Sequence, residues 1–169
     1  MNQTRYFPMF INLENRKVLV AGAGTIACRR IRTLLEFGAQ ITVAAPEICC
    51  ELEQYEAEGK ITVLRRKAGE ENWEDLFLFL ACTDDSAENR RLCAAARTAG
   101  ILANNCSSRE DCDFYFPSVI CKEELVIGIN AGGSSHGKVK KVRRKLEEYL
   151  DAEDIYGDRE YLPKKNLEQ

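Results

Sequence analysis

The sequence predicts an α/β protein whose core is an open, doubly wound parallel sheet, followed by a small β-hairpin and one helix. Three observations support this fold class. Apolar, β-branched runs alternate with helical patterns over residues 17–104, a glycine turn follows the first run, and a hairpin pattern replaces the alternation after residue 113. Alternating strands and helices favour a parallel sheet, because each parallel connection needs a crossover.

The expected sheet begins at residues 17–21, an apolar run that leads directly into the glycine turn. A helix is expected at 25–37, where apolar residues recur at helical spacing, and Gly38 ends it as a C-terminal cap. The β-branched run at 40–45 carries no charge, as a buried parallel strand should, and Pro46 ends it.

The later elements of the sheet continue the alternation. A polar helix is expected at 47–58, closed by Gly59, and a third strand follows at 61–64. Capping residues and acids at 83–86 indicate the start of another helix. The remaining expected elements are a strand at 77–82, a helix at 87–99 and a strand at 101–104.

A hairpin is expected after the sheet, from apolar runs at 116–121 and 125–129 joined by three polar residues. A basic helix with an apolar stripe follows at 136–150, and the stripe indicates packing against another subunit. We therefore expect a sheet domain at 1–113, a dimerisation and substrate-cleft unit at 114–150, and a short charged tail, mostly irregular, at 151–169.

The composition excludes several classes of partner. The chain has 169 residues and a formal net charge of -3, so it has no global attraction for nucleic acid or an anionic membrane. No run approaches the roughly 18 apolar residues that span a bilayer, and no signal-type segment stands at the start. We expect a cytoplasmic protein with neither a nucleic-acid nor a membrane partner.

The sequence contains eight cysteines but no C-x-x-C spacing and only one histidine, so zinc-type ligand spacing is missing and we expect no resident metal. Cys28, Cys82 and Cys93 fall inside apolar patterns, where reduced cysteine behaves as a small hydrophobe. Without an export signal, reduced packing cysteines are favoured over disulfides.

The glycine turn has the form G-x-G-x-x-A, with Gly22, Gly24 and Ala27 at its three positions. In dinucleotide-binding units the first glycine allows the tight turn, the second lets backbone approach a pyrophosphate, and the small residue lets helix pack on strand. The first helical amides, near Thr25 and Ile26, would point at the phosphates. A strand–turn–helix junction without a ligand is the alternative.

The strand ends give this motif a context, because doubly wound sheets bind ligands beyond the carboxyl ends of their strands. The second strand ends at Ala45, Pro46 and Glu47, where Glu47 could bond an adenosine ribose. No arginine stands at this tip to receive a 2′-phosphate, so NAD is favoured over NADP. The other predicted cofactor contacts are Thr83 and Asn104, and together they make 1–113 a Rossmann-type NAD-binding domain.

The chain resembles the dehydrogenase module of the siroheme synthases over roughly residues 6–150. The order and spacing of the matching segments make the resemblance specific, above all Thr-Asp-Asp at 83–85 and Cys-Asp-Phe at 112–114. The resemblance implies NAD-dependent oxidation of precorrin-2 to sirohydrochlorin by a homodimer, and because some members also insert iron, ferrous iron is a candidate second substrate. The other matching segments are 7–10, 17–27, 29–30, 34–39, 42–47, 81–82, 89–90, 116–117 and 132–135.

Departures from the family pattern define the candidate catalytic residues. The family usually carries an aspartate, assigned to dehydrogenation and chelation, where this chain has Ser107, and a serine is no anionic base without an activating partner. Ser107 would instead contact cofactor or substrate. Asp113 could supply the missing carboxylate, with a turn or capping role as the alternative. His136, the only imidazole, could move a proton or contact substrate, with a polar helix-start residue as the alternative.

The substrate implied by the resemblance is a reduced tetrapyrrole bearing carboxylates, which requires cations. Lys138 and Lys141 share one face of the basic helix, and Ser134 and Ser135 precede it. A solvated face is the alternative for this helix.

Arg29 and Arg30 lie one turn into the first helix, where a solvated face is the favoured interpretation. Two other functions stay open. One is a dual dehydrogenase and sirohydrochlorin ferrochelatase, and the other is a catalytically weak module that binds NAD or a tetrapyrrole.

Overall fold

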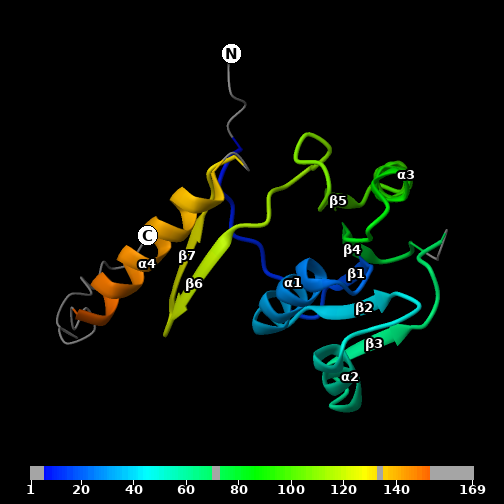
Figure 1. The fold of residues 1–169 in the computed structure, drawn as a ribbon, viewed down its shortest axis with the longest axis horizontal. Coiled ribbons are helices and arrows are strands. Elements are labelled where there is room, and N and C mark those ends of the chain that lie inside the picture. Colours follow the sequence, from blue (N-terminus) through cyan, green and yellow to red (C-terminus); the bar gives the residue numbers. More distant parts are fainter. Residues whose placement is uncertain (1–5, 70–72, 133–134, 153–169) are drawn as a thin grey trace, which may run out of the picture. The chain divides into compact units, whose positions relative to one another are not determined.

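The computed structural model describes residues 6–69, 73–132 and 135–152. It contains a five-stranded sheet and a separate two-stranded sheet (Figure 1). In chain order the elements are β1 (Lys17–Ala21), α1 (Thr25–Glu36), β2 (Gln40–Ala44), α2 (Cys50–Ala57), β3 (Ile61–Leu64), β4 (Leu76–Ala81), α3 (Ser86–Thr98), β5 (Leu102–Asn105), β6 (Ser118–Lys122), β7 (Leu125–Ile129) and α4 (His136–Ala152).

The large sheet has the strand order β3-β2-β1-β4-β5, and each of its pairings is parallel. Strands β2 and β3 extend to one side of β1, whereas β4 and β5 extend to the other. The direction of winding therefore reverses between β1 and β4, and ligands of such sheets bind at that switch point. The predicted doubly wound, Rossmann-type fold class is confirmed.

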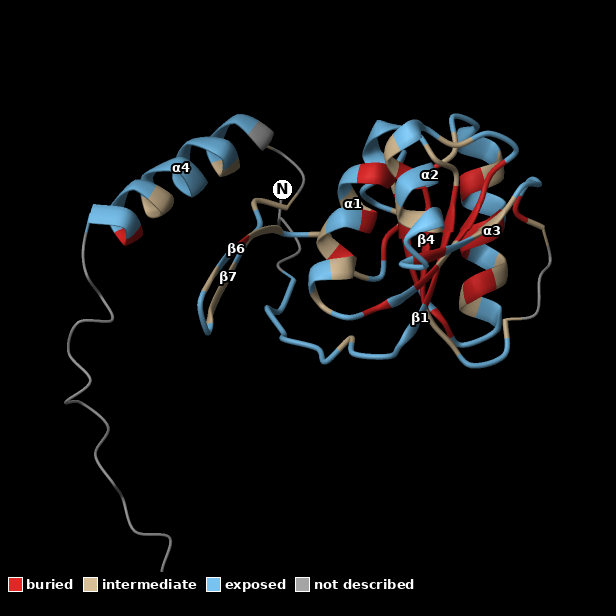
Figure 2. Cartoon of the chain, turned by 90° about the horizontal axis from the view of Figure 1, so that it is seen from below, coloured by how far each residue is buried: buried red, intermediate tan, exposed pale blue. Residues whose placement is uncertain are grey.

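Two apolar layers hold the sheet between its helices. Val20, Val43 and Leu80 face one layer, which the buried side chains of α1 and α2 complete. Leu19 and Phe79, from alternate positions of the same strands, face the other layer and pack with the buried side chains of α3. Figure 2 shows these buried residues in red along the strands and on the inner faces of the helices.

The element ends follow the predicted caps with one correction. Asp85 caps α3 by accepting hydrogen bonds from the backbone amides of Ala87 (2.9 Å) and Glu88 (3.0 Å). The helix predicted at 47–58 is wrong at its start, because Cys49 is the N-cap, with extended backbone at φ -80° and ψ 164°. The chain therefore bends at Pro46 and Glu47, and the helix begins only at Cys50.

The chain divides into two compact units between Phe116 and Pro117. In the second unit β6 and β7 form the predicted antiparallel hairpin, and α4 packs on β6. Lys122 donates to the carbonyl of Leu150 and pairs with the Asp151 carboxylate at 2.8 Å, which ties the hairpin to the helix end. Of the predicted tail, residues 153–169 lie outside the described residues.

None of the helices within the described ranges is both long enough and apolar enough to cross a bilayer.

Gly22 lies where β1 meets the end of β4, and its backbone has a left-handed φ of +96°. A Cβ built there would lie 2.5 Å from the carbonyl oxygen of Cys82 and 2.9 Å from the amide nitrogen of Thr83. Only glycine fits this position, because a side chain would be strained and would also collide with backbone.

Replacing Gly22 with alanine is therefore expected to lower the free energy of unfolding by about 3 kcal/mol, from backbone strain together with overpacking. Gly59→Ala is the matched control, since Gly59 also has a positive φ (+68°) but has nothing within 4 Å of a built Cβ. Its loss should be about 1 kcal/mol. Urea unfolding monitored by circular dichroism measures both, and equal losses would contradict the close approach at Gly22.

Candidate cofactor site

The N-terminus of α1 is open toward the carboxyl edge of the sheet. Gly24 is its N-cap, in extended backbone, with no side-chain cap, and the first turn contains no acid. A Cβ built at Gly24 would meet nothing within 4 Å. The first-turn amides of Thr25 and Ile26 have no intrahelical acceptor, and both residues are exposed. This arrangement of free amides without a neighbouring side chain fits a pyrophosphate.

Backbone hydrogen bonds gather the strand ends around this loop. The Gly22 amide donates to the Ala44 carbonyl (2.9 Å), and the Cys82 amide donates to the Ala21 carbonyl (2.8 Å). Ala45 is buried at the end of β2, whereas Pro46 and Glu47 beyond it are exposed. The ends of β2, β1 and β4 thus lie side by side. They bring most of the predicted cofactor contacts to one edge, namely Gly22, Gly24, Thr25, Ile26, Ala45, Pro46, Glu47 and Thr83.

Asn89 of α3 is fully buried and joins two loops at this edge. Its side-chain oxygen accepts from the amide (3.1 Å) and the hydroxyl (2.7 Å) of Thr83. Its side-chain nitrogen donates to the Thr83 carbonyl (2.9 Å) and to Oγ of Ser107 (3.2 Å). The sequence analysis missed this role, and the only available signal was the match at 89–90 to the resembling family.

Ser107 is brought beside Thr83 through Asn89, and its hydroxyl is already bonded twice. The Ser107 hydroxyl donates to Oδ1 of Asn105 (2.7 Å), which also accepts from the Ser107 amide (3.0 Å). Because the hydroxyl proton is directed at Asn105 and one lone pair receives Asn89, Ser107 is held as an exposed hydrogen-bond acceptor. Its predicted contact with cofactor or substrate stays a prediction.

Asp113 lies in a network that orders the loop after β5. Its carboxylate accepts from the Ala103 amide (2.8 Å) and from Nε of Arg97 (2.8 Å). Arg97 also binds Asp111 at 2.6 Å, and Asp111 accepts from the side chain of Asn105 at 2.9 Å. These contacts fit the turn or capping role that is the alternative interpretation of Asp113. Its catalytic role stays a prediction.

The network shifts the pKa of Asp111. Burial raises its pKa, but hydrogen bonds from Asn105 and Arg97, with the charge of Arg97, outweigh burial and hold the pKa below its usual value.

The interpretation of Arg30 as part of a solvated face is wrong, whereas Arg29 is exposed. The Arg30 guanidinium donates to Oδ1 of Asn104 and stands 5.1 Å from the ring centroid of Phe116. Burial lowers its pKa to about 10, so it remains charged at neutral pH.

Asn104 is 2% exposed and donates to the Phe114 carbonyl (2.7 Å), so its amide is engaged within the fold. Its predicted cofactor contact stays a prediction.

The expectation that Cys82 is a reduced packing residue is wrong in this structure, because Cys82 and Cys106 form a disulfide. The two cysteines directly follow β4 and β5, whose last residues, Ala81 and Asn105, are paired in register. This pairing brings their Cα atoms to 5.2 Å, within the usual range for a disulfide. The spacing of the cysteines along the chain could not predict this disulfide, because the disulfide depends on the register between β4 and β5.

The predicted substrate residues belong to the second unit, which we describe by itself. Lys138 and Lys141 are exposed on α4. Ser135 precedes the helix, and its carbonyl accepts from the Val139 amide at 3.2 Å. His136 begins α4, but its side chain, like Ser134 as a whole, lies outside the described residues. The substrate-binding role predicted for Lys138 and Lys141 stays a prediction.

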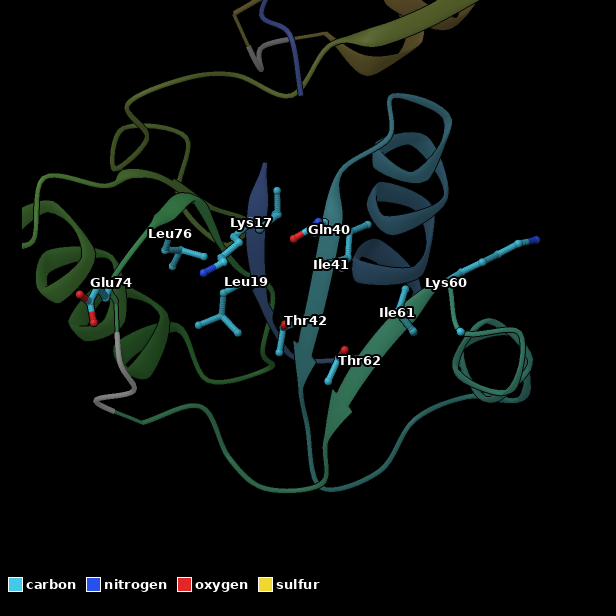
Figure 3. A pocket seen from close by; sticks show the side chains of 12 residues that line it. Lys17, Leu19, Gln40, Ile41, Thr42, Lys60, Ile61, Thr62, Glu74 and Leu76 are labelled. Atoms are coloured by element: carbon cyan, nitrogen blue, oxygen red, sulfur yellow. The ribbon is translucent and has the colours of Figure 1, made fainter. Parts of the chain in front are cut away.

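A hollow in the first unit lies away from the glycine loop (Figure 3). Lys17, Gln40 and Ile61, which line it, are the first residues of β1, β2 and β3, so it lies at the amino edge of the sheet. It is therefore distinct from the carboxyl edge where parallel sheets bind nucleotides. Within the described ranges, no group of three or more His, Cys, Asp or Glu side chains could hold a metal.

The chain is similar to several known proteins. The family model described as putative NAD(P)-binding matches residues 9–118. A siroheme synthase from Sodalis glossinidius is 37% identical over 145 residues, covering 86% of this chain and 31% of that protein. One from Neisseria meningitidis serogroup C is 38% identical over 145 residues, covering 86% of this chain and 30% of that protein. The chain thus spans less than a third of the length of these curated relatives.

Among solved structures, "SirC, precorrin-2 dehydrogenase" superposes with a TM-score of 0.70 at 33% sequence identity. The match covers 86% of this chain and 72% of that one.

The Arg97 network predicts a pH-dependent stability. Replacing Arg97 with glutamine should lower the free energy of unfolding by about 1–2 kcal/mol at pH 7. Because the folded-state pKa of Asp111 is lowered, its stabilising contribution is complete above the unfolded pKa and disappears as pH falls through the folded value. The difference between Arg97→Gln and wild type should therefore shrink as the pH falls below about 5 and through the lowered pKa of Asp111.

Urea unfolding at a series of pH values measures this difference. Arg91→Gln is the control, since Arg91 lies on the same helix in a surface pair with Glu88. A penalty for Arg97→Gln that is no larger than that of the control, or that does not change with pH, would contradict the network.

Proposed function

The chain belongs to the family described as putative NAD(P)-binding, and on that premise we propose that it oxidises precorrin-2 to sirohydrochlorin with NAD. One observation carries the proposal: the match to a precorrin-2 dehydrogenase covers most of both chains. The residues that match the family model, 9–118, include the glycine loop at the β1–β4 switch point. We further propose that the protein is cytoplasmic. We also propose that it works as a homodimer, because Val142 and Tyr149 leave apolar surface exposed on α4.

The glycine loop would hold the cofactor. Gly24 leaves space for the pyrophosphate, and the amides of Thr25 and Ile26 would donate to it along the α1 dipole. The exposed Glu47, beyond the end of β2, would accept from the adenosine ribose hydroxyls. When bound, NAD supplies the hydride acceptor, so the protein chiefly binds, orients and stabilises charge.

Ser107 would orient a reacting partner. Its Oγ keeps one lone pair beyond the hydrogen bonds with Asn89 and Asn105, and it could accept from an N–H of the substrate or of the carboxamide. This hydroxyl is an acceptor and not a base, so the released proton needs another path. We propose His136 for that step, because imidazole is the side chain that ordinarily titrates near neutral pH.

Two other functions compete with this proposal. The Ser107 hydroxyl is neutral and takes part in two hydrogen bonds. This favours a catalytically weak module that binds NAD or a tetrapyrrole. A dual enzyme would in addition insert ferrous iron into sirohydrochlorin, as the resemblance to siroheme synthases implies for some members.

Absorbance spectroscopy tests the proposal directly. Incubation with NAD and precorrin-2 should produce sirohydrochlorin, and the Gly24→Ala variant should need about tenfold more NAD for the same rate. The affinity for NAD falls because the added methyl group occupies the space for the pyrophosphate. The fold itself tolerates this methyl group, since a Cβ built at Gly24 meets nothing within 4 Å. The unfolding free energy of Gly24→Ala should stay close to that of wild type.

Tight binding of both ligands without turnover would favour the binding module over the enzyme. Iron insertion into added sirohydrochlorin above the spontaneous rate would favour the dual enzyme. An unchanged NAD requirement in Gly24→Ala would contradict the cofactor site at α1.

The double variant Lys138→Gln/Lys141→Gln should raise KM for precorrin-2 about tenfold through lost carboxylate contacts, with NAD affinity unchanged. Steady-state kinetics at saturating NAD measures the effect. Lys67→Gln is the control, because Lys67 is an exposed lysine of the first unit. If KM responds no more to the double variant than to the control, the α4 lysines do not bind the substrate.

A further inference from the structure

Two free thiols meet next to the glycine loop. Cys28 lies in the first turns of α1, and Cys49 is the N-cap residue of α2. Their Sγ atoms are 3.1 Å apart, although the residues are 21 positions apart in the sequence. This pair is separate from the Cys82–Cys106 disulfide.

The environments of the two sulfurs differ. Cys28 is 7% exposed, its Sγ lies 3.6 Å from the Ala23 carbonyl oxygen, and burial raises its pKa to about 12. Cys49 is exposed, and the hydrogen bond with Cys28 lowers the pKa of its thiol, helped by backbone amides in the first turn of α2. The nearby Glu51 carboxylate opposes this effect, but it is paired with Arg32 at 2.8 Å.

An exposed thiol with thiolate character beside a buried thiol is the arrangement that thiol–disulfide exchange requires. We propose that Cys28 and Cys49 form a redox-active dithiol, in which Cys49 attacks a low-molecular-weight disulfide and Cys28 resolves the product. Nothing in the cofactor chemistry uses either thiol, so the dithiol is a modification site additional to the proposed function.

The exchange has two steps. Cys49 first releases its proton to solvent. Its thiolate then attacks one sulfur of the small disulfide, whose S–S bond breaks, and the departing small thiolate takes up a proton from solvent. Cys28 then gives up its proton and attacks Cys49 Sγ, which displaces the second small thiol and forms the Cys28–Cys49 bond. The two cysteines lose one electron pair, and the small disulfide gains it as it becomes two thiols.

The bond would link two segments of the candidate cofactor site. Cys28 follows Ala27 of the glycine motif, and Cys49 follows Glu47 at the tip beyond β2. Sulfurs in a disulfide are about 2.05 Å apart, so the two sulfurs must close from the present 3.1 Å, which draws Cys49 toward α1. On the basis of the proposed function, this movement narrows the space between pyrophosphate and ribose contacts, and the oxidised protein binds NAD less tightly.

Peptide mapping by mass spectrometry tests the dithiol. The protein, incubated with excess glutathione disulfide, should yield a peptide pair linked through Cys28 and Cys49 that disappears on reduction. Cys28→Ser has no resolving thiol, but its hydroxyl can still donate a hydrogen bond to Cys49. In this variant glutathione should accumulate on Cys49 at least about threefold faster than on the exposed neighbour Cys50. Cys50→Ser is the matched control and should still form the linked pair.

Absence of the linked pair, or equal labelling of Cys49 and Cys50 in Cys28→Ser, would overturn the dithiol. Titration calorimetry tests its effect on NAD. Oxidised wild type should bind NAD several-fold more weakly than the reduced protein, while Cys49→Ser treated in the same way should show no change. A linked pair with unchanged NAD affinity would overturn the coupling alone. A reduced protein that binds no NAD would overturn the proposed function, while the mapping would still decide the dithiol.

Discussion

The backbone of Gly22 lies against the backbone of Cys82, and the candidate site depends on this close approach. Without a Cβ at Gly22, the ends of β1 and β4 come together at the point where the winding of the sheet reverses. The chain then enters α1, whose first-turn amides are open to the same edge of the sheet. They are open because Gly24, the N-cap residue, has no side chain and so makes no side-chain capping hydrogen bond. The two glycines of the loop thus serve different purposes, since Gly22 permits the close packing of β1 and β4 and Gly24 leaves room for a ligand.

The loops that follow β4 and β5 are held together by polar contacts and a covalent bond. Asn89 uses both ends of its amide to fix Thr83 and Ser107, which ties the loop after β4 to the loop after β5. The Cys82–Cys106 disulfide joins the same two strand ends. A buried amide with all its partners satisfied is a rigid connection. Near Gly24, in contrast, the free thiols of Cys28 and Cys49 connect α1 to the segment that follows β2. This contact is the redox-active dithiol that we propose.

Local patterns predicted the fold well, and long-range contacts account for what they missed. Strand and helix periodicity, the glycine turn and the Asp85 cap each depend on neighbouring residues, so the sequence placed most elements within one or two residues. The positions of Arg30, Cys82 and Cys106 depend on which strands pair and which face they present. The sequence reading therefore assigned Arg30 to solvent and Cys82 to the apolar packing. Asn89 was missed because a single polar residue in a helix usually indicates an exposed face.

A crystal structure of the protein with NAD tests the central claim most directly. We predict that the pyrophosphate oxygens lie within hydrogen-bond distance of the Thr25 and Ile26 amides, over Gly24, with the adenosine ribose near Glu47. NAD bound at the amino edge of the sheet, or a glycine loop that stays empty at saturating NAD, would contradict it.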